Sequence, residues 1–343
     1  MIPAVVEKSS NIVKVNPEFP QRVHLQKAAT LLRRGGLVAF PTETVYGLGA
    51  DALDPKAVAR IFKAKQRPTW DPLIVHVRDF AMAQSLAKEF PVSIAEKFWP
   101  GPLTLVAVKT SKVPDEVTAG RPNVAIRMPR HPVAKMLLTE AGLPIAAPSA
   151  NKFGRPSPTR AEHVIEDLGA DVDLILDAGP TPMGVESTVL DLTQTPPAIL
   201  RPGGVTREEI EAVIGPVTLA ASVADEVARQ SPGMSPQHYA PIGRVELFEN
   251  VDAMLARAID LRNRGHRTGA IVSDEIVPLL DKTTDFVSSF GKWGEWDRYA
   301  KRLFAAFRVF DKQGIVIILC LLPPAEGIGL AVRDRLQRAA GKA

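Results

Sequence analysis

Apolar residues recur along this chain with two different periods, and the periods separate helices from strands. In residues 55–65, Val58 and Ile61 fall on one side of a helix. Short apolar runs such as residues 37–40 predict buried strands instead. Because segments of the two kinds alternate up to about residue 215, the pattern predicts an α/β fold.

The predicted elements of this part have ordinary lengths. Helices are expected over residues 21–34, 55–65, 81–88, 93–99, 131–141, 160–168 and 207–214. Strands are expected over residues 37–40, 73–77, 103–108, 124–129, 143–147, 174–177 and 198–201. Residues 41–52, dense in hydroxyls and glycine, and residues 179–187, rich in proline and glycine, are expected to be loops.

The last hundred residues follow a strand and helix rhythm of their own. Strands are expected over residues 245–248, 268–272 and 314–322, and helices over residues 251–264, 296–311 and 329–339. This rhythm predicts a smaller, Rossmann-like parallel α/β domain. The polar residues 216–241 are typical of a linker, and the first 20 residues of an irregular arm. The predicted parts are therefore residues 1–20, 21–215, 216–241 and 242–343.

Composition narrows the class of protein without fixing it. The 42 basic and 38 acidic residues give a net charge of only +4, so a basic cleft is allowed and nucleic acid is not demanded. Cys320, the single cysteine, lies in a predicted buried strand, which excludes a disulfide framework and a cysteine metal site. The longest apolar run, residues 315–322, is too short to span a bilayer, and the N-terminus lacks a signal-peptide pattern. We therefore expect a cytoplasmic protein with no membrane partner.

Two cations stand where the helix over residues 55–65 must end. Pro68 pushes Arg67 into an extended conformation, so the helix ends at about Gln66. Residues two apart share one side of an extended segment, and Lys65 and Arg67 can therefore converge on one anion. The alternative is a solvated basic helix end that complements the helix dipole.

Arg127 occupies the middle of an apolar strand, over residues 124–129. A buried guanidinium needs a partner or a ligand because an unpaired buried charge is very costly. An ion pair and a ligand both remain open here. Residues 148–158 follow another strand and place short polar side chains at its carboxyl end, which suits a loop that cradles a ligand. An ordinary turn stabilised by Asn or Ser is the alternative.

Several familiar catalytic motifs are absent. Residues 47–52 formally match a dinucleotide-binding glycine pattern, but six loop residues precede the first glycine, so a Rossmann site is not expected there. The glycines are expected to let backbone approach a small ligand. The sequence contains no phosphate-binding P-loop, no serine nucleophile elbow and no H-E-x-x-H zinc motif.

The remaining polar residues gather at strand ends and in the adjoining loops. They are four cations, six hydroxyl or amide side chains and one imidazole: Lys65, Arg67, Arg127, Arg201, Thr42, Thr44, Ser149, Asn151, Ser157, Ser187 and His76. Such a set suits a polyanion and a small polar molecule, with positioning and charge neutralisation as the catalytic means. Mg²⁺ would be held mainly by phosphates, so no metal site of the protein's own is expected.

These residues carry a resemblance to a known family. The chain resembles YrdC-type threonylcarbamoyl-AMP synthases, in their long, two-domain form. The motifs that carry the resemblance are Lys65-Gln66-Arg67-Pro68, Pro72-Leu73-Ile74-Val75-His76, Pro41-Thr42-Glu43-Thr44-Val45-Tyr46-Gly47-Leu48, Pro148-Ser149-Ala150-Asn151, Glu186-Ser187-Thr188-Val189, Arg201-Pro202-Gly203 and the linker from Ser231 to Pro241. The resemblance implies a twisted, mixed, open sheet with helices as the first domain.

The resemblance also implies a reaction. L-Threonine, bicarbonate or CO₂, and ATP with Mg²⁺ would give L-threonylcarbamoyladenylate and pyrophosphate. Other proteins would use this product to modify an adenosine beside the tRNA anticodon. By position, threonine would contact Thr44, His76, Arg127, Ala147 and Ser187, with Arg127 on its carboxylate. ATP would contact Lys65, Arg67, Ser149, Asn151, Ser157 and Arg201, with Lys65 and Arg67 stabilising charge and Asn123 a weaker candidate.

Two positions depart from the family pattern, and the linker suggests a lid. Asp71 stands where relatives commonly have an amide or a base, and Ser235 replaces a longer residue. We expect residues 231–241 to close over the labile carbamate and exclude water, because Met234 and His238 are unusual in a mere spacer.

Two other functions are alternatives to the synthase. YrdC-like domains resemble basic concave surfaces, so a module that binds double-stranded RNA or tRNA is the main alternative. The even charge balance and the absence of a basic run interleaved with aromatic residues count against RNA binding as more than a weak activity. Carbamoyl transfer in hydrogenase maturation would need zinc-finger cysteines, and this chain has one cysteine.

Overall fold

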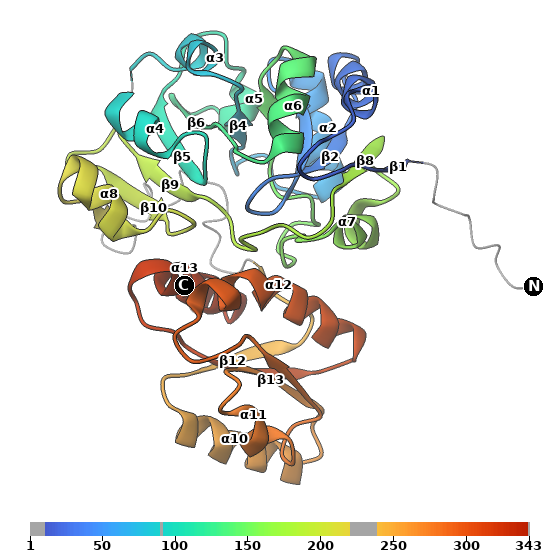
Figure 1. The fold of residues 1–343 in the computed structure, drawn as a ribbon, viewed down its shortest axis with the longest axis vertical. Helices are drawn as coiled ribbons and strands as arrows, with labels where there is room; N and C mark the ends of the chain where they lie inside the picture. Colours follow the sequence, from blue (N-terminus) through green and yellow to red (C-terminus); the bar gives the residue numbers. More distant parts are fainter. Residues whose placement is uncertain (1–10, 90–91, 220–238, 342–343) are drawn as a thin grey trace, which may run out of the picture. The chain divides into compact units, whose positions relative to one another are not determined.

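The computed structural model describes residues 11–89, 92–219 and 239–341. Its contacts divide the chain into two compact units. The first unit comprises Met1–Phe90, Trp99–Lys152 and Pro158–Thr181, and the second comprises Pro91–Phe98, Phe153–Ser157 and Pro182–Ala343. Figure 1 traces the chain through both units.

The first unit is built on a twisted mixed sheet whose strand order is β1-β8-β2-β3-β7-β4-β6-β5 (Figure 1). Its strands are Ile12–Lys14 (β1), Val38–Pro41 (β2), Tyr46–Asp51 (β3), Ile74–His76 (β4), Leu103–Val108 (β5), Asn123–Arg127 (β6), Ile145–Ala146 (β7) and Leu174–Asp177 (β8). β8 pairs in parallel with β1 and β2, and β4 does so with β6. The other neighbours are antiparallel. The predicted mixed α/β fold is therefore confirmed.

Helices flank this sheet and contribute buried side chains to its core. They are Arg22–Arg33 (α1), Pro55–Lys65 (α2), Phe80–Leu86 (α3), Asp115–Thr118 (α5), Pro132–Ala141 (α6) and Ala161–Leu168 (α7). α1 packs against α6. Leu25 and Leu32, two turns apart on α1, bury their side chains with Leu137 of α6 and Phe40 of β2. Apolar positions with helical spacing in the sequence are thus among those buried in the core.

Helix α2 begins and ends where its sequence dictates. The Asp54 carboxylate accepts a hydrogen bond from the Lys56 backbone N–H at 2.9 Å, so it caps the first turn. At the other end Gln66 adopts a left-handed conformation with φ 52°, which stops the helix after Lys65. The predicted helix is confirmed. The expected extended segment from Lys65 to Arg67 was wrong, because Lys65 is helical and Gln66 is left-handed.

The second unit holds a short ladder of strands with two helices. Its strands are Thr188–Asp191 (β9), Ala198–Arg201 (β10) and Thr218–Leu219 (β11), and its helices are Val92–Phe98 (α4) and Arg207–Ile214 (α8). β10 pairs antiparallel with β9 and parallel with β11. Thr206 and Glu209 form a reciprocal capping box that fixes the start of α8.

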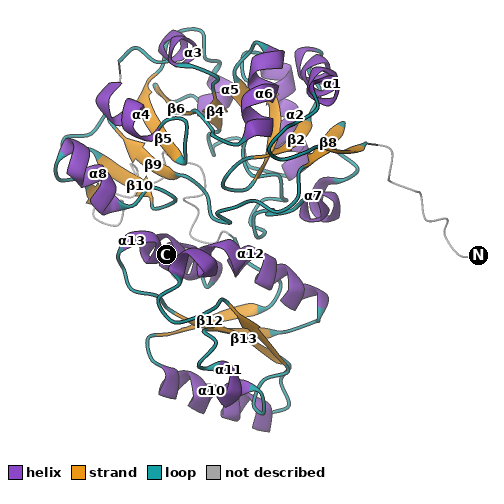
Figure 2. Cartoon of the chain, in the orientation of Figure 1, coloured by secondary structure: helices purple, strands orange, loops and turns teal. Residues whose placement is uncertain are grey.

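The second unit also contains the predicted C-terminal α/β domain. Its parallel sheet has the order β12-β15-β13-β14. The elements are Arg244–Phe248 (β12), Val251–Asn263 (α10), Thr268–Val272 (β13), Val277–Leu280 (α11), Phe286–Ser289 (β14), Trp296–Lys312 (α12), Ile317–Leu321 (β15) and Gly327–Ala339 (α13). Figure 2 shows α10 and α11 on one face of this sheet and α12 and α13 on the other. Cys320 is buried in β15, as predicted.

Strands β3 and β1 lie where the sequence pattern predicts a loop and an irregular arm, and β11 lies in the expected linker. β3 occupies the expected loop over residues 41–52 and pairs antiparallel with β2. A Cβ on Gly49 would come within 2.8 Å of Phe40 and Ile145, so this glycine permits close packing inside the sheet. β1 lies in the expected irregular arm and pairs in parallel with β8.

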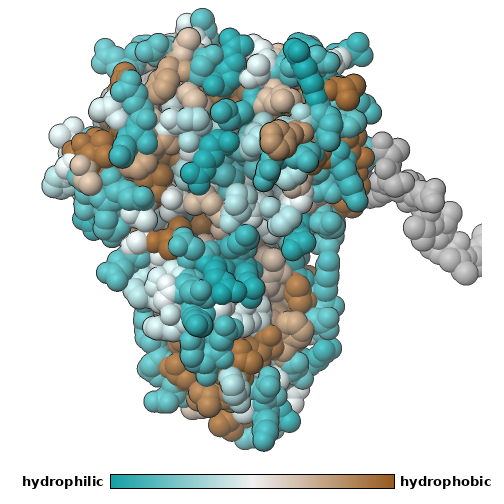
Figure 3. Space-filling model, in the orientation of Figure 1, coloured by the Kyte–Doolittle hydropathy of each residue, from teal (hydrophilic) through white to brown (hydrophobic). Residues whose placement is uncertain are grey.

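The surface agrees with the mixed composition. Hydrophilic residues cover much of the face shown in Figure 3, with scattered hydrophobic ones between them. Among the described helices, none is long and apolar enough to cross a membrane.

Candidate active site

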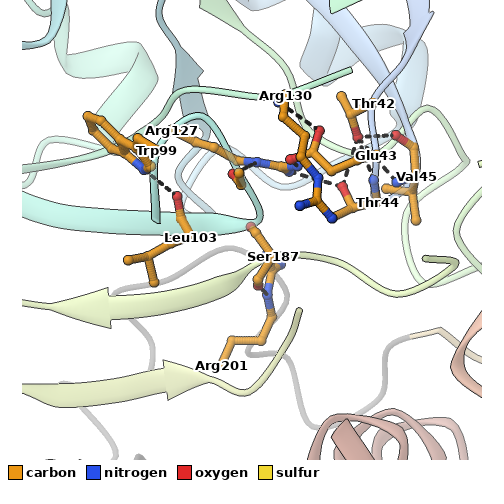
Figure 4. A network of polar contacts seen from close by, with 11 residues as sticks. Thr42, Glu43, Thr44, Val45, Trp99, Leu103, Arg127, Arg130, Ser187 and Arg201 are labelled. Atoms are coloured by element: carbon orange, nitrogen blue, oxygen red, sulfur yellow. Dashed lines mark hydrogen bonds and ion pairs between the residues drawn. The ribbon is translucent and has the colours of Figure 1, made fainter. Parts of the chain in front are cut away.

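Arg127 is held by a buried network in the first unit. Its Nη2 lies 2.6 Å from Glu43 Oε1, its Nη1 donates to Thr44 Oγ1 at 3.0 Å, and its Nε donates to Gly101 O at 3.2 Å. Figure 4 shows the guanidinium directed at Glu43 and Thr44. The Arg127 and Glu43 side chains are only 4% and 2% exposed. Of the two alternatives left open by the sequence, the ion pair is therefore present.

Glu43 is the acid that balances this arginine. Its second carboxylate oxygen accepts a hydrogen bond from the Arg130 backbone N–H at 3.2 Å. Burial alone would raise the pKa of Glu43, but the Arg127 charge and these hydrogen bonds hold it below its usual value. Glu43 thus remains ionised and fixes the plane of the guanidinium.

The Thr44 hydroxyl has a defined hydrogen-bond direction. The Thr42 hydroxyl donates to Val45 O at 2.7 Å, and the two threonine oxygens lie 2.8 Å apart. Because the Thr42 hydroxyl donates its one hydrogen to Val45 O, Thr44 must be the donor in the hydrogen bond between the two hydroxyls. Thr44 Oγ1 in turn accepts from Arg127. The loop between β2 and β3 therefore presents Thr44 in one orientation (Figure 4).

His76 lies beside Arg127 on the neighbouring strand. The two residues are register partners in the parallel pair of β4 and β6. Both ring nitrogens of His76 are buried and lack a hydrogen-bond partner among the described residues. Burial, together with the Arg127 charge, lowers the pKa of His76 to about 3, so the imidazole is neutral. A neutral buried imidazole with one free donor and one free acceptor is suited to a polar ligand.

A backbone hydrogen bond places Ala147, which directly follows β7, beside strand β4. Its N–H donates to Ile74 O at 2.9 Å, which places it beside the start of β4. Thr44, His76, Arg127 and Ala147 thus belong to adjoining strands or strand ends of one sheet. The structure brings these four predicted residues together, while Ser187 lies in the second unit.

Lys65 anchors the loop that follows β7. Its ammonium donates to Ser149 O at 2.6 Å and to Asn151 O at 2.5 Å. The same loop pairs with β3 through Leu48 N to Pro148 O and Ala150 N to Tyr46 O, both 2.8 Å. Burial and the nearby Arg67 charge lower the pKa of Lys65 well below its usual value.

Arg67 is folded back on its own loop. Its Nη2 lies 2.8 Å from an Asp71 oxygen and donates to Pro72 O at 2.8 Å. Both side chains of the pair are 3% exposed. The alternative of a solvated basic helix end is therefore wrong, because Lys65 and Arg67 are both buried. Asp71, the departure from the family pattern, serves as the partner of Arg67.

The second unit places Ser157, Ser187 and Arg201 in another buried network. Arg201 Nη2 donates to Ser187 O at 3.1 Å and to Ser187 Oγ at 3.2 Å (Figure 4). The Ser157 hydroxyl donates to Glu186 Oε1. Glu186 also pairs with Arg335 Nε at 2.8 Å. All five residues are buried, with Ser157 and Arg335 completely so.

Sequence reasoning missed the acids and one base of these networks. Glu43 and Glu186 each directly precede a predicted contact, Thr44 and Ser187, in a loop that enters a strand. That adjacency was a usable signal, since a buried hydroxyl loop with a carboxylate needs a cation nearby. Arg335 lies on an amphipathic helix and carries no comparable signal.

Part of the predicted lid lies outside the described residues. Residues 231–238, which include Met234, Ser235 and His238, are among the undescribed ones. Tyr239 is described and is buried, with φ 62° in the left-handed region. Its ring stacks on Phe304 with centroids 5.5 Å apart. The end of the linker is thus fixed to α12.

The carboxylates around these residues do not form a metal cage. Among the described residues, no group of three or more His, Cys, Asp or Glu side chains could hold a metal ion. Glu43, Asp71 and Glu186 each pair with an arginine instead.

Comparisons with known proteins agree with this architecture. Residues 30–203 match the Sua5/YciO/YrdC family model, described as telomere recombination, and residues 205–341 match the model described as threonylcarbamoyl-AMP synthase, C-terminal domain. The threonylcarbamoyl-AMP synthase of Bacillus subtilis is 44% identical over 323 residues, which cover 92% of this chain and 93% of that protein. The threonylcarbamoyl-AMP synthase of Pyrococcus abyssi is 44% identical over 329 residues, with the same coverage.

A solved structure matches both units. The crystal structure of Pyrococcus abyssi Sua5 complexed with L-threonine is 43% identical and aligns with a TM-score of 0.89. The alignment covers 96% of this chain and 98% of that one. The resemblance read from the motifs is therefore confirmed, and the chain belongs to the threonylcarbamoyl-AMP synthase family of Sua5/YciO/YrdC proteins.

Proposed function

We propose that this protein joins L-threonine, bicarbonate or CO₂, and ATP into L-threonylcarbamoyladenylate, with release of pyrophosphate. The observation that carries the proposal is the buried cluster of Arg127, Thr44 and neutral His76, in a chain of this family. The cluster offers a fixed guanidinium, a fixed hydroxyl and an unpartnered imidazole. These groups complement an amino acid that carries a hydroxyl and a carboxylate.

Each proposed threonine contact has a separate task. Arg127 binds the carboxylate, and Glu43 prevents the guanidinium from rotating away. Thr44 and the backbone edge at Ala147 orient the substrate. His76 hydrogen-bonds it without adding charge, because its pKa of about 3 keeps the ring neutral. Ser187 of the second unit is the fifth proposed contact.

The nucleotide contacts are proposed from the remaining cations, hydroxyls and amides. They are Lys65, Arg67, Ser149, Asn151, Ser157 and Arg201, with Asn123 as an additional candidate. The neutral threonine amine forms a bond to the carbon of CO₂ and loses one proton to solvent, which gives a carbamate. A carbamate oxygen then attacks the α-phosphorus of ATP, and the bond from that phosphorus to the pyrophosphate oxygen breaks. Lys65 and Arg67 stabilise the charge that develops on the phosphates. Mg²⁺, bound mainly by those phosphates, would neutralise part of the same charge.

The organisation and setting of the protein are part of the proposal. Residues 21–215 are the proposed catalytic domain, and residues 242–343 are the proposed C-terminal domain. The product passes in the cytoplasm to proteins that transfer its threonylcarbamoyl group to a tRNA adenosine. RNA binding by this chain itself is at most weak, because its net charge is only +4.

The proposal is tested by pyrophosphate release from the purified protein. ATP and Mg²⁺ are supplied throughout, and L-threonine and bicarbonate are omitted one at a time. We expect release only when both are present, and loss of release in the double variant Lys65→Ala, Arg67→Ala. Release that does not depend on threonine would contradict the proposal and direct attention to RNA binding.

A further inference from the structure

Arg335 of α13 is completely buried, which is unusual for arginine. Its Nε lies 2.8 Å from Glu186 Oε2, and its Nη2 donates to Pro202 O at 3.0 Å. Its Nη1 pairs with Asp334. The guanidinium carbon lies 5.0 Å from the centre of the Tyr239 ring. All four of these partners belong to the second unit.

The partners of Arg335 flank two proposed substrate contacts. Glu186 directly precedes Ser187, and Pro202 directly follows Arg201. The two segments touch, since a Cβ on Gly203 would lie 2.3 Å from the Ser187 carbonyl carbon. Arg201 itself donates to the oxygens of Ser187. Arg335 thus holds both segments that carry these contacts.

The positive charges of two arginines act on the buried Glu186 carboxylate. Burial alone would raise the pKa of Glu186, but the charges of Arg335 and then Arg201, with the Ser157 hydroxyl, hold it below the usual value. Tyr239 also interacts electrostatically with Arg201, and Asp334 pairs with Arg335. Arg335 forms a short ion pair with the Glu186 carboxylate, at 2.8 Å.

We propose that Arg335 is a positioning residue, which neutralises Glu186 and thereby leaves Arg201 on Ser187, directed toward the nucleotide. The inference rests on the proposed function, in which Arg201 contacts ATP. It gives the C-terminal domain a task in the reaction, although Arg335 is not a proposed substrate contact. A helix near the end of the chain would then control the charge of the nucleotide site.

The variant Arg335→Met removes the charge and keeps an apolar stem of similar length. The buried Glu186 carboxylate would then have Arg201 as its nearest cation, and the Arg201 guanidinium would move toward it. We expect nucleotide affinity to fall about tenfold or more. The loss should be smaller at pH 6 than at pH 8.5, because burial without Arg335 raises the pKa of Glu186 and low pH neutralises it.

The double variant Arg335→Met, Glu186→Gln separates positioning from mere structural support. It removes both charges, so Arg201 has no carboxylate to move to, and affinity should recover. A purely structural role predicts the opposite, since the double variant loses more native hydrogen bonds than the single one. Arg335→Lys retains the charge and should keep most of the affinity even if Arg335→Met folds poorly.

Affinity is measured by calorimetric titration of the full chain with α,β-methylene-ATP, Mg²⁺ and L-threonine, with circular dichroism to check folding. Arg333→Met is the matched control. Arg333 lies on the same helix and pairs with Glu249 at 2.7 Å, but that glutamate is 65% exposed. Arg201→Met shows how far nucleotide affinity falls when the proposed Arg201 contact with ATP is lost.

The outcomes separate this inference from the proposed function. Weak binding by Arg335→Met, recovery in the double variant and normal binding by Arg333→Met would support it. Normal binding by Arg335→Met beside weak binding by Arg201→Met would overturn it and leave the proposed function intact. A double variant weaker than the single one would also overturn it. A wild-type protein that does not form the adenylate would overturn the proposed function, and the inference with it.

Discussion

Single residues in this protein are held by buried pairs of opposite charge. Arg127 with Glu43 and Arg67 with Asp71 are each almost fully enclosed. Such pairs add little net stability over an apolar pair of equal size, but removal of one partner leaves an expensive buried charge. Their effect here is orientation, because a paired guanidinium keeps one plane.

The variant Arg127→Met tests this arrangement. It should lower the free energy of unfolding by about 3–5 kcal/mol, because Glu43 would remain buried without its cation. The rate of pyrophosphate release should also no longer saturate as the threonine concentration rises. Urea unfolding followed by circular dichroism measures the first effect, and pyrophosphate release against threonine concentration measures the second.

Arg130→Met is the control for this comparison. Arg130 is exposed, and the hydrogen bond to Glu43 comes from its backbone N–H. This variant should behave like the wild type in both measurements. Equal destabilisation by the two variants would show that the Arg127 pair has no special role.

His76 makes a prediction about pH. Its folded pKa of about 3 lies below the unfolded value of 6.5, so the unfolded chain binds more protons between these values. The His76 contribution to stability is therefore present above pH 6.5 and is lost as pH falls. Between pH 6.5 and pH 5 the loss amounts to about 1.5 kcal/mol.

The variant His76→Gln should remove this component of the pH dependence. The difference in unfolding free energy between wild type and variant, measured by urea titration at several pH values, isolates it from the other titrating groups. A difference that stays constant from pH 7 to pH 5 would mean that His76 is protonated in the folded protein.

The residue scale also shows where sequence reasoning stops. Thr44, His76 and Arg127 were predicted because polar groups at strand ends are visible in one sequence. Glu43 and Glu186 were overlooked although they adjoin predicted residues. The partners that hold them, Arg127 and Arg335, are 84 and 149 positions away along the chain. Pairings of that range depend on the folded topology.

At the scale of elements, local signals were sufficient where they were strong. The start and end of α2 follow from Asp54, Pro55 and Pro68. β3 was missed because Gly47 and Gly49 imitate a loop, whereas the strand uses them to pack closely against β2. β1 was missed because three residues carry too little pattern, and its partner β8 lies far along the chain.

The α2 cap makes a prediction at this scale. Asp54→Ala should lower the free energy of unfolding by about 1 kcal/mol, because the Lys56 N–H loses its acceptor. Asp54→Asn keeps an acceptor and should stay close to wild type. Thermal unfolding of the wild type and the two variants measures these differences in stability. A loss as large in Asp54→Asn would mean that charge, and not capping, is what Asp54 provides.

At the scale of the whole molecule, the chain combines a mixed sheet and a separate parallel sheet. The sequence predicted both classes because each follows from the order of helices and strands. The mixed pairing within the first sheet came from the family resemblance, since strand periodicity does not reveal partners. The two family models cover residues 30–203 and 205–341, so both parts have counterparts in known synthases.

The most direct test of the central claim is to identify the product. The purified protein is incubated with ATP, Mg²⁺, L-threonine and ¹³C-labelled bicarbonate, quenched rapidly and examined by mass spectrometry. The account predicts threonylcarbamoyladenylate that carries one ¹³C in its carbamoyl group and disappears in Arg127→Met. An adenylate of threonine itself, without the labelled carbon, would contradict the account.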